Sequence, residues 1–125
     1  MNVSRILCIG NELLIGEVVN SNAAYIAKFL TKRGYFVDKI LCVRDDYKAI
    51  ANEVIAAKRE NVNYLFTTGG LGPTYDDITI ESLSKVLSLN LVLKEEVLLK
   101  LKARAEARGH MFNDAIKKMA YLPEG

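Results

Sequence analysis

Residues 63–77 read NYLFTTGGLGPTYDD, a short apolar run that enters a glycine-rich loop and ends on two acidic residues. The apolar run is typical of a β-strand that is buried on both faces. Three glycines within four positions let the following backbone adopt positive φ angles and come close to a ligand. Beyond the acidic pair, the spacing of Ile80, Leu83 and Leu87 predicts a helix. The stretch therefore predicts a strand, a glycine loop and a helix in succession.

The same alternation of strand and helix occurs twice before this stretch. Residues 5–10 and 36–43 are short apolar runs that predict two further strands. A helix is expected between them, from Asn22 onward, with Ser21 or Asn22 as its cap and Gly34 at its end. The apolar positions of this helix are Ala23, Ile26, Ala27 and Leu30, and those of the helix before the glycine loop are Ile50, Val54 and Ala57.

The last third of the chain carries one more strand-like run and two helical patterns. Residues 91–93 form a short apolar run, and an amphipathic helix follows that Gly109 ends. A further turn or two of helix is expected over residues 113–120, and residues 122–125 read as a turn. The apolar positions of the amphipathic helix are Val97, Leu98, Leu101 and Ala105.

Strands that alternate with helices in a chain of domain size predict a single α/β domain. Right-handed crossovers then produce a mostly parallel sheet with helices on both faces. The 125 residues contain no internal repeat, low-complexity tract or linker that would divide them. The expected architecture is therefore one layered α/β domain over residues 1–125.

Composition excludes several classes of protein. Half of the residues are hydrophobic and 26% are charged, which is globular composition, and a net charge of +2 is too small to favour nucleic acid or an anionic membrane. The sequence contains no apolar run of 18 residues, so no transmembrane helix is predicted. Glu12 and Glu17 interrupt any signal-peptide core. Cys8 and Cys42 lie in apolar runs, so both are expected to be buried and reduced. These features predict a cytoplasmic protein.

Three loops are expected to meet at one edge of the sheet. Ligands of open parallel sheets bind beyond the carboxyl ends of the strands, which here are residues 10–17, 44–46 and 67–77. These loops would bring Glu12, Asp45 and Asp77 together beside the glycine loop. The first residues of the helix that follows the first strand point to the same edge, namely Asn20, Ser21 and Asn22.

The glycine loop favours a phosphate or pyrophosphate group. Thr68 and Thr74 add hydroxyl donors to the exposed backbone, and the loop leads into a helix whose N-terminus favours anions. The loop is not a P-loop, because no lysine follows its last glycine, and Tyr75 stands where a dinucleotide-binding fingerprint needs its third glycine. The alternative is a tight strand-to-helix turn that needs glycine only for its geometry.

The carboxylates add a second requirement. Aspartates beside a phosphate repel it unless a divalent cation bridges them, or one of them orients a water or binds a polar ring. Each aspartate could instead be a helix N-cap, which is the favoured interpretation for Asp46 and an open alternative for Asp45 and Asp77. Glu12 has no helix to cap, so a functional role is favoured for it.

These residues resemble a known family. Residues 10–16, 20–22, 44–46 and above all 67–79 are similar to the amino-terminal domain of the competence/damage-inducible CinA family, which has the MogA/MoaB/MoeA-type molybdopterin-binding fold. The resemblance covers essentially the whole chain and implies a three-layer α/β/α domain. Relatives continue beyond the Leu-Pro-Glu-Gly of residues 122–125, so the resemblance implies a domain that is truncated at its C-terminal end.

The resemblance also implies a set of site residues. Asp45 and Asp77 match the two aspartates that molybdopterin-type relatives use in their pocket, which implies catalytic roles and metal binding for both. The ligand and its phosphates would be held by Gly10, Glu12, Asn22, Thr68, Gly69, Gly70, Gly72, Thr74 and Asp76.

Two functions follow from the resemblance. The first is a metal-dependent ADP-ribose pyrophosphatase that uses Mg²⁺, Mn²⁺ or Co²⁺; the second is a non-catalytic module that binds molybdopterin or a nucleotide. A third possibility is an interaction domain with a vestigial pocket. The deamidase domain that CinA proteins carry at their carboxyl end has no counterpart in this sequence. Because relatives are commonly oligomeric, a homo-oligomer is expected.

Overall fold

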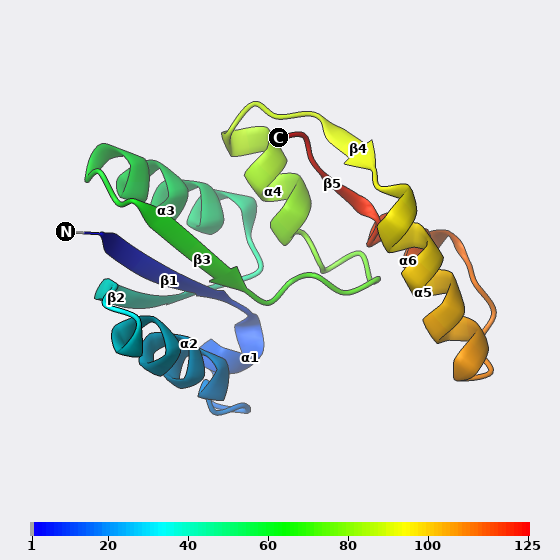
Figure 1. The fold of residues 1–125 in the computed structure, drawn as a ribbon, viewed down its shortest axis with the longest axis horizontal. Helices are drawn as coiled ribbons and strands as arrows, with labels where there is room; N and C mark the ends of the chain where they lie inside the picture. The colour runs from blue at the N-terminus through cyan, green and yellow to red at the C-terminus, as the bar shows by residue number, and fades with distance from the viewer. Residues whose placement is uncertain (1) are drawn as a thin grey trace.

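A computed structural model describes residues 2–125 of the chain. Its centre is a three-stranded parallel sheet in the order β2 (Phe36–Val43), β1 (Val3–Ile9) and β3 (Tyr64–Thr68), shown in Figure 1. β1 is buried from its second residue to its last, which explains why its apolar run does not alternate with polar residues. All three strands end at the same edge, as the sequence predicts.

Helices cover both faces of this sheet. α2 (Ser21–Lys32) covers one face, and α3 (Tyr47–Arg59) and α4 (Thr79–Val86) cover the other (Figure 1). Successive side chains of β1 point to opposite faces, so Ile6 packs against the α2 layer while Leu7 packs against the α3 layer. The predicted α/β/α layering is therefore confirmed.

The helix starts can be compared residue by residue with the predictions. α3 begins as expected, because the Asp46 carboxylate accepts a hydrogen bond of 3.0 Å from the Ala49 N–H. α2 begins differently: its cap is Asn20, which accepts from the Ala23 N–H at 3.3 Å, rather than Ser21 or Asn22. The stretch after β1 also departs from prediction, since residues expected as loop form a short helix, α1 (Asn11–Leu14), with Glu12 in its first turn.

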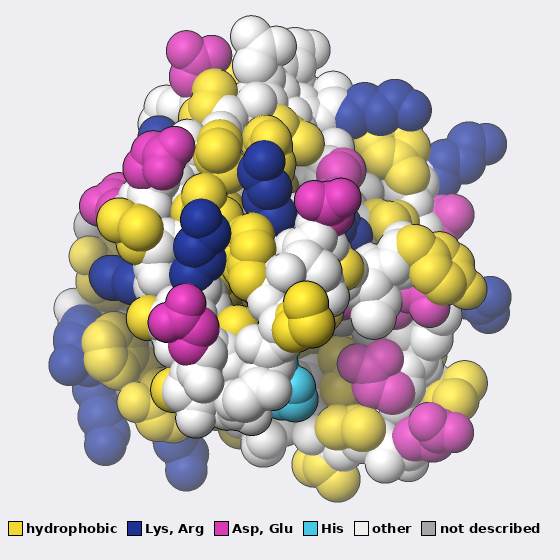
Figure 2. All heavy atoms as spheres, turned by 90° about the vertical axis from the view of Figure 1, so that its right-hand side faces the viewer, with side chains coloured by type: hydrophobic (Ala, Val, Ile, Leu, Met, Phe, Trp, Pro, Cys, Tyr) yellow, Lys and Arg dark blue, Asp and Glu magenta, His cyan; other side chains and the backbone are white. Residues whose placement is uncertain are grey.

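A second, smaller unit follows α4. It consists of β4 (Leu91–Leu93), α5 (Glu95–Ala107), α6 (Asp114–Lys118) and β5 (Tyr121–Pro123). β4 and β5 pair antiparallel, apart from the parallel sheet, and β5 contacts α4. The expectation of a turn over residues 122–125 is thus wrong for Leu122 and Pro123. In Figure 2, which faces this end of the molecule, basic and acidic side chains are interspersed rather than segregated.

Two residues that were expected to face the core, Cys42 and Leu87, are exposed. Cys8 is buried as predicted, but Cys42 is exposed because β2 is an edge strand. The thiol of Cys42 is still partly shielded from water, and this desolvation raises the pKa of Cys42. In α4, Leu83 packs on the core as predicted, whereas Leu87 is 40% exposed because the helix has already ended at Val86. Among residues 2–125, no helix has the length and apolar character needed to span a membrane.

A buried cation lies at the opposite edge from the predicted site. The Arg5 side chain on β1 is 3% exposed and makes a bidentate contact with Asp38, at 2.7 and 3.2 Å, and a 2.6 Å contact with Glu60. The hydrogen bonds from Arg5 hold the pKa values of both carboxyl groups below their ordinary values. This cluster ties β1, β2 and the end of α3 together.

Candidate functional site

The loops after β1 and β2 are joined by a reciprocal pair of hydrogen bonds. The Asn11 N–H donates to Asp45 Oδ2 at 3.2 Å, and the Asp45 N–H donates to Asn11 Oδ1 at 3.2 Å. The Gly10 N–H adds a 3.0 Å bond to the Val43 carbonyl. Asp45 is therefore held by the neighbouring loop and does not cap α3, whose cap is the next residue. Asn11 is a site residue that the sequence did not single out.

The glycine loop after β3 needs its first two glycines for packing. Gly69 and Gly70 have φ angles of +88° and +67°, which favour glycine. A Cβ on Gly69 would lie far inside van der Waals distance of the Ile9 carbonyl oxygen, and one on Gly70 would collide with the Thr79 hydroxyl. That hydroxyl donates to the Gly69 carbonyl at 2.8 Å. The loop is thus clamped between β1 and the first residue of α4, and buried Thr79 is a second residue that the sequence did not reveal.

The loop closes with a turn from Thr74 to Asp77. Asp77 Oδ2 accepts from the Thr74 N–H at 2.9 Å and from the Thr74 hydroxyl at 2.7 Å, and the Asp77 N–H donates to the Thr74 carbonyl at 3.1 Å. A Cβ on Gly72 would lie 2.6 Å from the same carboxylate oxygen, so glycine is needed there for space. The N-cap of α4 is Ile78, so the capping alternative for Asp77 is wrong.

The turn determines the charge state of Asp77. Burial raises the pKa of Asp77, but hydrogen bonds from Thr74 and from the Gly72 backbone, together with the charge of Lys118, outweigh burial and leave the pKa below its ordinary value. Asp77 is therefore ionised at neutral pH. The hydroxyl and N–H of Thr74, predicted as phosphate donors, are instead used by this carboxylate.

An acidic pocket of about 360 Å³ opens where the three loops meet. Four of the carboxylates predicted from the sequence meet in it, and no lysine or arginine is among its described lining residues. The acidic pocket is lined by Ile9, Asn11, Glu12, Asp45, Gly70, Asp76 and Asp77.

A second cavity, of about 130 Å³, lies at the start of α2, and we call it the α2 pocket. Ile9 and Glu12 line both cavities, so the two are adjacent. Hydroxyl and amide groups dominate the polar lining of the α2 pocket, where Glu12 is the one carboxylate among the described lining residues. It is lined by Ile9, Glu12, Leu13, Val18, Val19, Asn20, Ser21, Asn22, Thr68 and Gly69.

The structure therefore separates the predicted residues into groups. Glu12, Asp45, Gly70, Asp76 and Asp77 line the acidic pocket, and Asn22, Thr68 and Gly69 line the α2 pocket with Glu12. Gly10 is buried below the loops, and Gly72 and Thr74 lie in neither lining but shape the turn that holds Asp77.

Divalent cations are one possible occupant of the acidic pocket. Within residues 2–125, no three histidine, cysteine or acidic side chains converge into a complete metal centre. Mg²⁺ is commonly held by only one or two carboxylates together with phosphate oxygens and water. Asp45 and Asp77 fit that second arrangement, because both line one pocket and both are carboxylates fixed by backbone hydrogen bonds.

The family model described as "Probable molybdopterin binding domain" matches residues 5–123, which is nearly the whole chain. The chain belongs to this molybdopterin-binding domain family. A protein of Pyrococcus furiosus is 43% identical over 98% of the domain and 51% of its own length. The domain spans about half the length of the curated relatives it matches.

Solved structures support the same relationship. The CinA protein of Thermoplasma acidophilum has 35% sequence identity and a TM-score of 0.85, covering 98% of the domain and 70% of that chain. The molybdopterin biosynthesis enzyme MoaB of Thermus thermophilus has 25% identity and a TM-score of 0.65, covering 74% of the domain and 58% of that chain. The predicted resemblance to CinA and to the MogA/MoaB-type fold is therefore confirmed.

Proposed function

We propose that the domain binds a phosphorylated pterin of the molybdopterin type across the acidic pocket and the α2 pocket. The observation that carries the proposal is that two adjacent pockets share Ile9 and Glu12, one lined mainly by carboxylates and the other by hydroxyl, amide and apolar side chains. A pterin phosphate has a matching division, with N–H donors on its ring and a negative charge at its other end. The molybdopterin-binding domain family and the likeness to the molybdopterin biosynthesis enzyme MoaB support the same class of ligand.

The α2 pocket suits the phosphate. The N-terminus of the 12-residue helix α2 lies there, and its partial positive charge favours an anion. Thr68 supplies a hydroxyl and Asn22 a side-chain amide, and Gly69 also lines this pocket. A phosphate in the acidic pocket would instead face four carboxylates.

The acidic pocket suits the ring. Carboxylates accept hydrogen bonds from N–H donors, and bonds with a charged acceptor are roughly twice as strong as neutral ones. Asp77 is ionised and fixed by the Thr74 turn, and Asp45 is fixed by Asn11, so both acceptors are oriented before a ligand arrives. A divalent cation on Asp45 and Asp77 would suit the opposite placement, with a ligand phosphate in the acidic pocket, where the cation would neutralise phosphate charge and polarise a P–O bond.

A second candidate function is hydrolysis of the pyrophosphate in ADP-ribose. The observation that favours it is the pair of fixed carboxylates in one pocket, and the resemblance to CinA proteins implies the same activity. In this reaction a water oxygen bonds to one phosphorus while the bond from that phosphorus to the bridging oxygen breaks, which yields AMP and ribose 5-phosphate. Asp45 or Asp77 would orient the water and accept its proton.

Binding and hydrolysis can be tested in one series of measurements. Molybdopterin and ADP-ribose are titrated by calorimetry, and ADP-ribose is incubated with Mg²⁺, Mn²⁺ or Co²⁺ and assayed for AMP. We expect Asp77→Asn to weaken binding at least about tenfold, which corresponds to loss of a hydrogen bond to a charged group. Glu106→Gln, which removes one exposed negative charge on α5, is the matched control and should bind like the wild type.

The outcomes separate the two functions. Binding without AMP in the presence of any of the three metals supports the binding domain and eliminates the pyrophosphatase. AMP that disappears in Asp45→Asn and Asp77→Asn, but not in Glu106→Gln, supports the enzyme. Wild-type affinity in Asp77→Asn would remove this residue from the site.

A further inference from the structure

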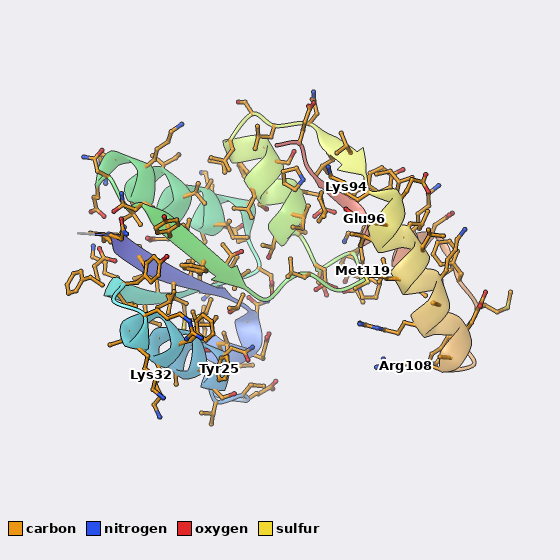
Figure 3. The ribbon with its side chains drawn as sticks, in the orientation of Figure 1. Tyr25, Lys32, Lys94, Glu96, Arg108 and Met119 are labelled. Atoms are coloured by element: carbon orange, nitrogen blue, oxygen red, sulfur yellow. The ribbon has the colours of Figure 1, made fainter. Side chains whose placement is uncertain are left out.

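Lys118 reaches from the small unit to the turn that holds Asp77. Its Nζ lies 2.6 Å from the Thr74 carbonyl oxygen and 2.6 Å from the Asp77 carbonyl oxygen, and 3.6 Å from Glu81 Oε1 on α4. Met119, the next residue, is labelled in Figure 3 close to α5 in the same unit. The contacts join segments that are 44 and 41 residues apart in the chain.

Lys118 donates hydrogen bonds to the first and the last residue of the Thr74–Asp77 turn. The two residues whose carbonyls it binds are the same two whose side chains are joined by the Thr74–Asp77 hydrogen bonds. Hydrogen bonds from an ammonium group are stronger than neutral ones, and the Lys118 side chain is only 28% exposed, so water competes weakly for it. The main chain of the turn, and with it the direction of the Asp77 carboxylate, is therefore held from outside the parallel sheet.

Contacts within the small unit hold the helix that carries Lys118. The Asn113 side chain caps α6 at the Ile116 N–H, at 2.9 Å, and two residues after α6 the chain enters β5, which pairs with β4. The five-residue α6 is thus held at its start by its cap and beyond its end by the β4–β5 pair. Lys118 and Asp77 also line the same apolar cavity of about 250 Å³ between the loop and this unit.

We infer that Lys118 is a positioning residue for the ligand site, which orders the Thr74–Asp77 turn and couples the β4–β5 unit to the acidic pocket. Lys118 is not among the lining residues of the acidic pocket and acts through its contact with Asp77. The inference deepens the proposed function and rests on it for the statement about ligand affinity. The statement about the turn stands on the contacts alone.

The test compares three variants. Lys118→Met removes the charge and the donors but keeps the length of the side chain, Lys118→Arg keeps both charge and donors, and Lys117→Met alters the neighbouring lysine on the same helix. Binding of molybdopterin and ADP-ribose is measured by calorimetry, and hydrogen exchange is measured at the Thr74 and Asp77 amides. Exchange at β1 amides reports on the rest of the fold.

We expect Lys118→Met to weaken binding about tenfold and to accelerate exchange at the two turn amides while β1 amides stay protected. Lys118→Arg should restore at least half of the lost affinity in logarithmic terms, and Lys117→Met should stay within about twofold of the wild type. Should Lys118→Met unfold, Lys118→Gln takes its place with the same expected order.

Two results would overturn the inference. One is unchanged exchange at the Thr74 and Asp77 amides in Lys118→Met, and the other is unchanged affinity despite faster exchange. If the wild type binds neither ligand, the proposed function fails, and the exchange measurement alone then decides the role of Lys118 in the turn.

Discussion

Replacement of Gly69 by alanine tests how the ligand loop is seated on the sheet. An alanine at φ +88° costs about 1–2 kcal/mol, because the left-handed conformation brings its Cβ close to the backbone. The new Cβ also meets the Ile9 carbonyl oxygen, a backbone atom of the central strand that cannot rotate away. Overpacking of this kind costs about 1–3 kcal/mol more. Gly69→Ala should therefore lower the free energy of unfolding by about 2–5 kcal/mol.

Gly34→Ala is the matched control for this change. Gly34 has a φ of +82°, and a Cβ added there meets nothing within 4 Å. The control therefore carries the conformational cost of about 1–2 kcal/mol without the collision. Both substitutions reduce the entropy of the unfolded chain equally, so that effect cancels in the comparison.

Urea denaturation at neutral pH measures both variants, and ligand titration at low temperature measures the site. We expect Gly69→Ala to be less stable than Gly34→Ala by about 1–3 kcal/mol, with the same dependence on urea concentration. We also expect Gly69→Ala to bind ligand more weakly, whereas Gly34→Ala binds normally. Equal losses of stability in the two variants would contradict the contact between the loop and β1.

Two further predictions concern the opposite edge of the sheet and the thiols. Arg5→Met should lower the free energy of unfolding by about 2–3 kcal/mol, below the range for fully buried pairs because Asp38 and Glu60 keep access to water. The folded pKa of Asp38 is depressed, so the stability that its ion pair contributes is complete above the ordinary pKa near 3.8 and is lost as pH falls further. The urea midpoint of Arg5→Met should therefore fall less steeply with pH in acid than that of the wild type. Equal dependence of the two midpoints on pH would contradict the ion pair. A maleimide should label Cys42 slowly in the folded protein, because its pKa is raised, and should label Cys8 only in urea, because Cys8 is 0% exposed. Mass spectrometry that finds both thiols labelled without urea would refute this prediction.

The parallel sheet could be predicted because its signals are local. Residues 36–43 were expected as a strand and form β2 with the same bounds, and Asp46 caps α3 as its position before an apolar helical pattern suggests. The site edge followed from one topological rule, since parallel strands end at one side and ligands bind beyond their carboxyl ends. The acidic pocket accordingly contains Glu12, Asp45 and Asp77.

The β4–β5 pair could not be predicted, because its signal is too short. Three residues give no period-two pattern, and the antiparallel partners Leu91 and Pro123 are far apart in the sequence. A proline in a terminal Leu-Pro-Glu-Gly segment is also more typical of a turn than of a strand.

The contacts that orient the site are equally invisible in the sequence. Asn11 binds Asp45 across 34 residues, and Lys118 binds the Asp77 carbonyl across 41. Sequence separations of this length produce neither a periodic pattern nor a motif. The sequence therefore predicted that these carboxylates meet at one edge of the sheet, but the residues that hold them in place required the three-dimensional structure.

The central claim is that a phosphorylated heterocyclic ligand occupies the two adjacent pockets that share Glu12. Its most direct test is titration of the ¹⁵N-labelled protein with molybdopterin, with inorganic phosphate as the reference ligand. We predict that molybdopterin shifts the amide signals of Asn11, Asp45 and Gly70 in the acidic pocket together with those of Asn22 and Gly69 in the α2 pocket. Phosphate should shift only the α2 pocket group. Shifts confined to other surfaces, or unchanged spectra at saturating molybdopterin, would contradict the claim.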